Sequence, residues 1–285
     1  QYIIMKKYIT VAALLAAGAA FSNAAVETEL LWGLDFTSSS LGLSTGEGTS
    51  VSGSGTISTT GGAVAGTGSY STSGTAANIL KFTASGTTSA LNKQSGAFTL
   101  SFHAKWDGES GNQWPVLASF GENNGYCAKV NFAADSGNAT ASSTGTYGFA
   151  PDGYNFSENT RGETVTLDSD WHHFVVTFEG GSDSATLTLY VDGTSTATVN
   201  WTVAGLDNDN PMTAFSFGGR LGNNNNNANM SFSDIAVYSG VLEADQIAYL
   251  GDNKANASAI PEPSAFGLLA GLGALALVAS RRRRK

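Results

Sequence analysis

The sequence has almost no cysteine and none of the common motifs of nucleophilic catalysis. Its 285 residues include one cysteine, Cys127, so an intramolecular disulfide is excluded. A catalytic thiol would need a histidine partner and an activating environment, and we expect Cys127 to be buried in a strand instead. The sequence contains no serine nucleophile elbow, no phosphate-binding glycine-rich loop and no Cys-x-x-Cys pair. It therefore offers no motif for nucleophilic or phosphoryl-transfer chemistry.

Positive charge is scarce over most of the chain. Seven of the 14 Lys and Arg residues lie near the two ends, in the pair Lys6-Lys7 and the block 281–285, whereas 22 of the 23 Asp and Glu residues lie within residues 25–260. The body, residues 25–260, thus has seven cations against 22 acids, a net charge of −15. Neither nucleic acid nor an anionic membrane would be attracted to such a body. Gly, Ser, Thr and Asn dominate its polar positions and present hydroxyls and amides.

Residues 1–24 have the pattern of a secretory signal peptide. A short basic region at Lys6 and Lys7 precedes an apolar, alanine-rich stretch at 8–21, and small residues follow at 22–24. We expect signal peptidase to remove this segment, and we exclude it from the fold. Residues 1–4 precede the expected initiator Met5, and we interpret them as an upstream extension.

The C-terminal residues 261–285 have a three-part pattern. A helix-breaking tripeptide comes first, then an uncharged apolar segment at 265–280, then a block of cations. The tripeptide is Pro261, Glu262 and Pro263, and the block is Arg281, Arg282, Arg283, Arg284 and Lys285. The block cannot cheaply enter hydrocarbon, so we expect it to stay on the cytoplasmic side. The apolar segment spans about 24 Å against roughly 30 Å of hydrocarbon, which predicts a marginal, transient transmembrane helix.

This pattern resembles the PEP-CTERM sorting tail of bacterial exported proteins. The resemblance implies that an exosortase-type membrane protease cuts near Pro261-Glu262-Pro263 and passes the body to the cell surface, outer envelope or extracellular matrix. Before that cut, the helix at 265–280 would anchor the chain in the inner membrane. We interpret residues 253–260 as the linker to this tail. Both ends therefore predict that the body is exported.

Residues 25–252 read as short strands separated by turn residues. Residues 98–106 alternate apolar and polar side chains, which predicts a half-buried strand. The segments 171–178 and 185–193 predict an antiparallel hairpin, whose second strand ends at an Asp192-Gly193 turn. Many short strands with turn chemistry between them predict an all-β, two-sheet sandwich.

Two segments of this body are less regular. Residues 37–73 are rich in Gly, Ser and Thr, which predicts loops and weak strands or, equally, a mobile insertion. Residues 241–250 predict a short surface helix.

Six motifs in this body carry a second resemblance. They are Phe98-Thr-Leu-Ser-Phe, Trp171-His-His-Phe-Val-Val-Thr-Phe, Leu187-Thr-Leu-Tyr-Val-Asp-Gly, Phe217-Gly-Gly, Phe232-Ser-Asp-Ile-Ala-Val-Tyr and Val241-Leu-Glu-Ala-Asp-Gln-Ile. In this order they resemble the laminin-G-like branch of the concanavalin A-like lectin/glucanase superfamily, over about residues 26–250. The resemblance implies an antiparallel jelly roll. It implies no single function, because the fold hosts lectins, hydrolases and adhesion modules.

Hydrolysis of a polysaccharide would need two carboxylates on one face of a strand, about 5–9 Å apart. The hydrolases of this superfamily use a Glu-x-Asp-x-Glu run, which is missing here. Asp168 and Asp170 have alternate spacing but lie in an expected turn. We therefore interpret the protein as non-catalytic. The alternative is a secreted polysaccharide hydrolase with a diverged carboxylate pair, for which Glu109 and Glu122 are the candidates.

His172 and His173 are neighbours in a predicted strand. Successive strand side chains point to opposite faces, so the two imidazoles cannot bind one metal in regular geometry. We expect both to pack or to form hydrogen bonds.

Two loops have the composition of a glycan-binding surface. Sugar rings stack on aromatic faces, and their hydroxyls bond amides and carboxylates. The candidate binding residues are Trp106, Trp114, Asn123, Asn124 and Tyr126, of which Trp114 and Tyr126 are the preferred stacking residues. The alternative is that these aromatics close the rim of the sandwich.

Calcium is the only cofactor that the sequence suggests. Hard cations take carboxylate and amide oxygens, which Asp207 and Asp209 would supply in an Asp-Asn-Asp-Asn stretch. The same composition is typical of a solvated loop. Taken together, the sequence predicts an exported, non-catalytic surface or matrix protein that is glycan-binding, adhesive or structural, with surface or matrix polysaccharide as its partner.

Overall fold

The structure is a computed structural model that describes residues 28–43, 49–84, 89–122, 125–150, 161–182, 184–202, 211–222 and 226–255. The predicted signal peptide and the predicted sorting tail both lie outside these residues. Within them, no helix has the length and apolar character needed to cross a membrane.

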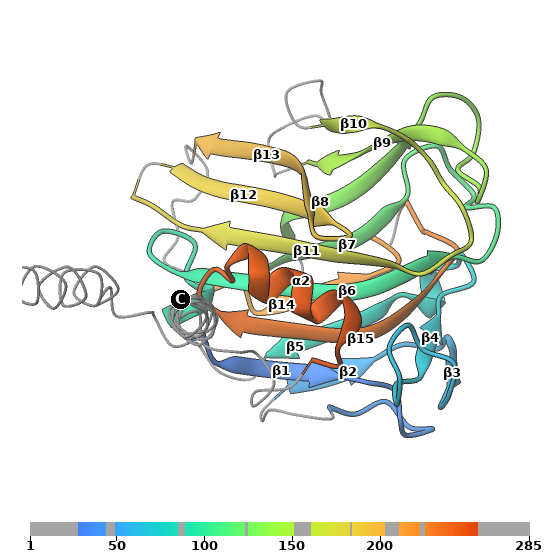
Figure 1. Cartoon of the computed structure of the whole chain (residues 1–285), viewed down its shortest axis with the longest axis horizontal. Coiled ribbons are helices and arrows are strands. Elements are labelled where there is room, and N and C mark those ends of the chain that lie inside the picture. The colour runs from blue at the N-terminus through green and yellow to red at the C-terminus, as the bar shows by residue number, and fades with distance from the viewer. Residues whose placement is uncertain are drawn as a thin grey trace, which may run out of the picture. The chain divides into compact units, whose positions relative to one another are not determined.

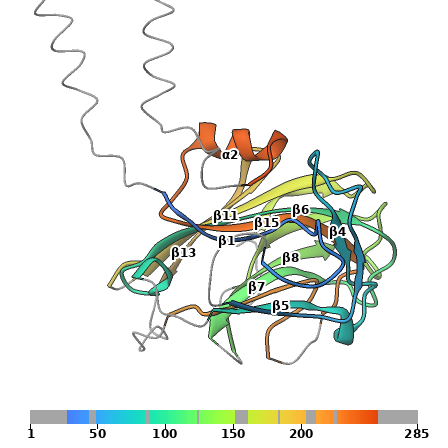
Figure 2. The same cartoon turned by 90° about the horizontal axis from the view of Figure 1, so that it is seen from below.

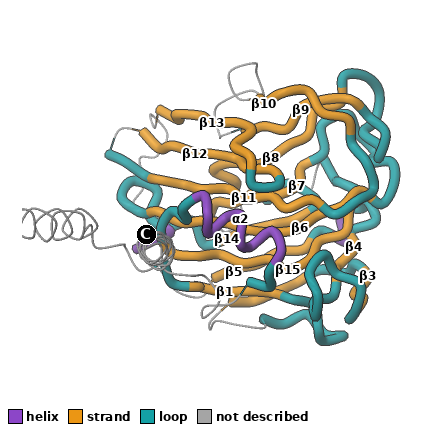
Figure 3. Tube along the Cα trace, in the orientation of Figure 1, coloured by secondary structure: helices purple, strands orange, loops and turns teal. Residues whose placement is uncertain are grey.

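Two antiparallel sheets form the folded unit (Figures 1 and 3). The first sheet has the order β13 (Thr194–Thr202), β12 (Ser184–Val191), β11 (His172–Glu179), β6 (Ala97–Trp106), β15 (Met230–Ser239), β4 (Ser69–Ser71) and β3 (Thr56–Ser58), and β1 (Leu30–Leu34) also pairs with β15. The second sheet has the order β10 (Arg161–Thr166), β9 (Thr144–Phe149), β8 (Gly125–Ala134), β7 (Val116–Glu122), β14 (Ala214–Phe217), β5 (Leu80–Ala84) and β2 (Thr49–Ser52). Short 3₁₀ turns occur at Ala76–Asn78 and Ser89–Leu91. The predicted two-sheet jelly-roll sandwich is confirmed.

The predicted hairpin forms between β11 and β12. Glu179 pairs with Thr186 next to the connection between the two strands, and Phe174 pairs with Val191 at the far end. The next turn joins β12 to β13, and its residues Asp192 and Gly193 take φ values of 50° and 75°. A tight turn with two left-handed residues matches the twist of the strands, and Asp-Gly is a preferred pair for it.

Aromatic rings fill the space between the sheets. Phe98 of the first sheet meets Phe120 and Phe215 of the second edge-to-face, with centroids 5.5 Å and 5.9 Å apart. All three side chains are fully buried. Contacts of this kind make the interior of the sandwich one continuous apolar cluster.

Helix α2 (Ala244–Asp252) covers the outer face of the first sheet (Figure 2). A capping box between Glu243 and Gln246 starts it. Its residues Ile247 and Leu250 pack with Val175 and Tyr238 in a second apolar cluster. The predicted surface helix therefore exists, but it also seals part of the sheet.

Because α2 covers the outer face of the first sheet, strand β6 is more buried than its sequence pattern predicts. The alternating pattern predicts one solvated face, yet Thr99, Ser101 and His103 on its outer face are all buried. The segment before α2 supplies partners: Thr99 Oγ1 donates to the Gly240 carbonyl at 2.9 Å and accepts from the Leu242 amide at 3.0 Å. The prediction of a half-buried strand is wrong because α2 and its connection cover the second face.

Part of the Gly/Ser/Thr-rich stretch 37–73 is ordered into the short strands β2, β3 and β4. Tyr70 of β4 is fully buried, and its hydroxyl accepts from the Gly55 amide at 2.7 Å and donates to the Asn78 carbonyl at 3.0 Å. One aromatic side chain thus fixes a segment whose composition predicts loops.

The aromatic contacts between the sheets lead to a test of the core. Phe98→Ala removes a ring that both sheets contact, and we expect the free energy of unfolding to fall by about 3–5 kcal/mol. Thr198→Ala, at an exposed position of β13, is the control and should change it by no more than about 0.5 kcal/mol. Urea unfolding measures both. An equal loss in the two variants would contradict this description of the core.

Candidate functional site

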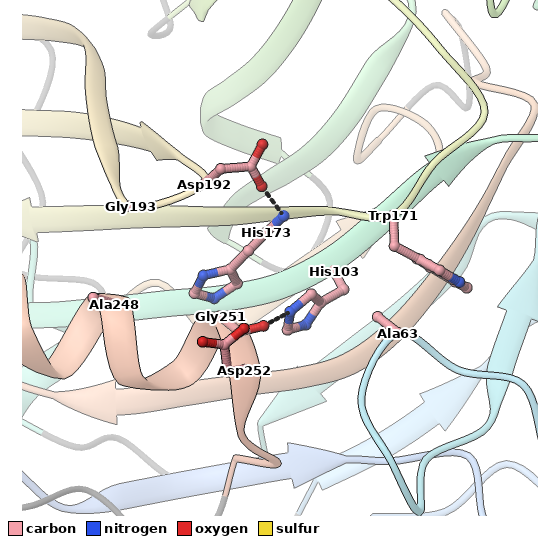
Figure 4. A pocket seen from close by; sticks show the side chains of 9 residues that line it. All are labelled: Ala63, His103, Trp171, His173, Asp192, Gly193, Ala248, Gly251 and Asp252. Atoms are coloured by element: carbon pink, nitrogen blue, oxygen red, sulfur yellow. Dashed lines mark hydrogen bonds between the residues drawn. The ribbon is translucent and has the colours of Figure 1, made fainter.

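Two histidines meet on the outer face of the first sheet. Strands β6 and β11 pair so that His103 lies opposite His173. Their rings stack with centroids 4.6 Å apart and an interplanar angle of 23°. The last turn of α2 lies over them (Figure 4).

The hydrogen bonds of this pair fix one proton position. His103 Nε2 lies 3.1 Å from the Gly251 carbonyl oxygen, and because that oxygen only accepts, Nε2 must carry the hydrogen. In the neutral ring, His103 Nδ1 is then an acceptor. His173 Nε2 pairs with Ser101 Oγ at 2.8 Å. The Nδ1 atoms of both rings are buried and have no hydrogen-bond partner in the protein.

Burial keeps both imidazoles uncharged. It lowers the pKa of His103, and it lowers the pKa of His173 to about 3, where the neighbouring ring of His103 adds to the shift. At neutral pH the pair therefore consists of two neutral imidazoles under a helix.

His172 has the opposite environment, as expected for the next residue in a strand. Its Nδ1 donates to Asp192 Oδ2 at 2.7 Å, and its Nε2 donates to Asp168 Oδ1 at 3.0 Å. The hydrogen bond to Asp192 is the main cause that raises its pKa to about 9. Asp192 Oδ1 also accepts from the His173 amide at 2.9 Å. With both nitrogens engaged, His172 holds Asp192 in place and has no free lone pair for base chemistry.

A pocket of about 340 Å³ opens beside the stacked pair (Figure 4). It is lined by Ala63, His103, Trp171, His173, Asp192, Gly193, Ala248, Gly251 and Asp252. The Lys105 ammonium lies 5.2 Å from the centroid of the Trp171 ring. The pocket thus combines one indole, two imidazoles and two carboxylates.

A metal centre does not fit this arrangement. Among the described residues, no group of three or more His, Cys, Asp and Glu side chains is placed to hold a metal ion. In addition, the in-plane lone pairs of two stacked rings run side by side and do not converge on one ion.

The two candidate tryptophans have different environments. Trp106 is 2% exposed, packs edge-to-face on Phe132 and donates from Nε1 to the Tyr147 hydroxyl at 3.4 Å. Its ring faces the core and offers no surface to a ligand. Trp114 is 52% exposed, and its carbonyl accepts from the side-chain amides of Asn131 at 3.3 Å and Asn226 at 3.0 Å. Trp114 therefore presents its ring to solvent from a fixed backbone.

The other candidates are only partly described. Asn123, Asn124, Asp207 and Asp209 lie outside the described residues, as do Pro261 to Pro263 and Arg281 to Arg284. Tyr126 and Cys127 belong to β8 and Glu122 to β7, but their side chains are outside the description. Glu109 Oε1 accepts from Asn138 Nδ2 at 2.7 Å in an exposed loop. The Asp170 amide donates to Asp168 Oδ1 at 2.8 Å, as expected for a turn.

The sequence reasoning missed the pairing of His103 with His173. These residues lie 70 positions apart, and only the register between β6 and β11 brings them together. The polar face of the predicted strand at 98–106 was the one available signal, because it includes His103.

Comparisons with known proteins agree with this fold. A family model described as the concanavalin A-like lectin/glucanases superfamily matches residues 80–248, more than half of the chain, and a PEP-CTERM protein-sorting motif matches residues 259–284. No curated protein matches the chain.

Among solved structures, the botulinum neurotoxin serotype G binding domain is similar at 14% identity and a TM-score of 0.51, over 78% of this chain and 50% of that one. Botulinum neurotoxin type C, whose cell entry depends on interaction with two ganglioside molecules, is similar at 15% identity and a TM-score of 0.52, over the same shares. The chain spans about half the length of these structures. At such identities the likeness shows the fold alone.

The buried imidazoles predict acid sensitivity. The unfolded chain binds a proton at His173 near the ordinary pKa of 6.5, whereas the folded protein does so only near pH 3, so stability is lost as the pH falls below 6.5. Asp234, whose pKa burial raises to about 6, acts in the opposite direction. His173→Gln isolates the histidine: between pH 6 and pH 4 the variant should lose less stability than the native chain, by up to about 1.4 kcal/mol per pH unit. Urea unfolding across this range measures the two slopes, and equal slopes would contradict the prediction.

Proposed function

We propose that this chain, which belongs to the concanavalin A-like lectin/glucanase superfamily, is an exported, non-catalytic protein that binds surface or matrix polysaccharide. The exposed ring of Trp114 is the observation that supports polysaccharide binding. The sorting motif at residues 259–284 supports export.

The two ends of the chain support export. In this proposal signal peptidase removes residues 1–24, and the segment 265–280 holds the chain in the membrane while Arg281 to Arg284 stay on the cytoplasmic side. An exosortase-type protease then cuts near Pro261-Glu262-Pro263. The sandwich, within residues 25–252, reaches the cell surface, outer envelope or matrix.

The environment of Trp114 supports binding to a glycan. An exposed indole offers a flat apolar face on which a sugar ring can stack. Around it, Gln113 Nε2 donates to the Ala134 carbonyl at 2.8 Å and Asn112 Nδ2 to the Asn227 carbonyl at 3.0 Å, so this stretch of backbone is held on both sides. A stacking surface that is already ordered costs little conformational entropy on binding.

The carboxylates favour a non-catalytic role. A glycosidase needs one free carboxylate and one protonated carboxyl across the scissile bond. Glu109 is engaged by Asn138, and Asp168 and Asp192 are both engaged by His172. None of these described groups forms a free pair on one strand.

Retention on polysaccharide tests the proposal. The full-length chain in mild detergent should be retained on surface polysaccharide from its host, and Trp114→Ala should weaken retention on the order of tenfold because the stacking face is lost. Val241→Ala is the matched control, since Val241 is the other large hydrophobic residue exposed in the described part of the chain. Retention that does not change in Trp114→Ala would overturn the assignment to Trp114, and no retention of the native chain would overturn glycan binding.

A further inference from the structure

We propose that the pocket beside the stacked histidines, lined by Trp171, His103, Asp192 and Asp252, binds one neutral sugar ring of a glycan. This inference rests on the proposed function for its class of ligand, but it places a second site at a different surface from Trp114.

The side chains that line the pocket include several hydrogen-bond acceptors, so they match a ligand with several donors. Asp192 and Asp252 supply carboxylate oxygens, and His103 Nδ1 at the floor is an acceptor whose tautomer is fixed by the Gly251 carbonyl. That Nδ1 atom is buried and without a partner in the protein, and a buried acceptor that is left unsatisfied destabilises the folded state. A ring that carries several hydroxyls can donate to such a set.

The charges around the pocket favour an uncharged ligand. The His172 imidazolium is bonded to both Asp168 and Asp192 and offsets part of their charge, while Asp252 adds a further carboxylate at the opening. The Lys105 ammonium, which lies 5.2 Å from the centroid of the Trp171 ring, is paired with Asp107. No described group of side chains is placed to hold a metal ion. The carboxylates repel an anionic ligand, and without a described group that could hold a metal ion, a neutral ligand is the better match.

Size and shape fit a single ring. A volume of about 340 Å³ lies at the lower end of the range of small-ligand pockets, roughly 300–1,000 Å³. Trp171 comes from the turn before β11, Asp192 from the turn after β12 and Asp252 from the end of α2 (Figure 4). Two turns and the end of a helix thus meet around one opening, and the His103–His173 pair forms its floor.

Titration with neutral monosaccharides tests the site. The full-length chain in mild detergent is titrated with glucose, galactose, mannose and xylose, while the imidazole C–H signals of His103 and His173 are followed by NMR. We expect saturable shifts of these signals for at least one sugar. Trp171→Ala and the isosteric, exposed Asp252→Asn should each weaken this binding on the order of tenfold, whereas Trp114→Ala should leave it unchanged.

The outcomes separate this site from the one at Trp114. Absence of saturable shifts with all four sugars, or equal binding in native, Trp171→Ala and Asp252→Asn proteins, overturns the pocket. Loss of monosaccharide binding in Trp114→Ala also overturns it, because the sugar then binds at the other surface. If the pocket fails while polysaccharide retention still depends on Trp114, the proposed function stands. If neither sugar nor polysaccharide binds, both fail.

Discussion

The burial of strand β6 on both of its faces is the constraint on which the rest of the structure depends. Its inner face packs through Phe98 and Phe102 into the aromatic core, and its outer face carries polar side chains that α2 and its connection cover. Buried polar groups must find partners, so Thr99, Ser101 and His103 each bond to a defined atom. The helix therefore docks in one position.

This docking also creates the candidate pocket. Because His103 donates to Gly251, the last turn of α2 is held over the pair with His173, and Asp252 is brought to the opening beside Trp171. His172 bonds to both Asp168 and Asp192, and these bonds fix Asp192, which also lines the pocket. Trp114 is independent of this arrangement, since its backbone is held by Asn131 and Asn226. The sandwich thus has two candidate binding surfaces, the pocket beside the histidines and the exposed Trp114, and each is held by different contacts.

Sequence reasoning predicted what depends on local pattern. Alternation over 98–106 located β6, and the Asp192-Gly193 pair located the turn between β12 and β13, because each signal lies within a few residues of sequence. It could not predict what depends on contacts between distant segments. Burial of the outer face of β6 requires α2, about 140 residues later, and the contact between His103 and His173 requires strand register. Trp106 and Trp114 both looked suited to stacking, and only three-dimensional packing separates the buried ring from the exposed one.

The proposal that both surfaces bind polysaccharide depends on export, because polysaccharide of the cell surface or matrix lies outside the cytoplasm. The most direct test is mass spectrometry of the mature C-terminus of the native protein, combined with fractionation of host cells. The account predicts a chain that begins near residue 25, ends near Pro261 and occurs in the surface or matrix fraction. Recovery of the chain from the soluble cytoplasm, with residues 5–24 and 261–285 intact, would contradict it.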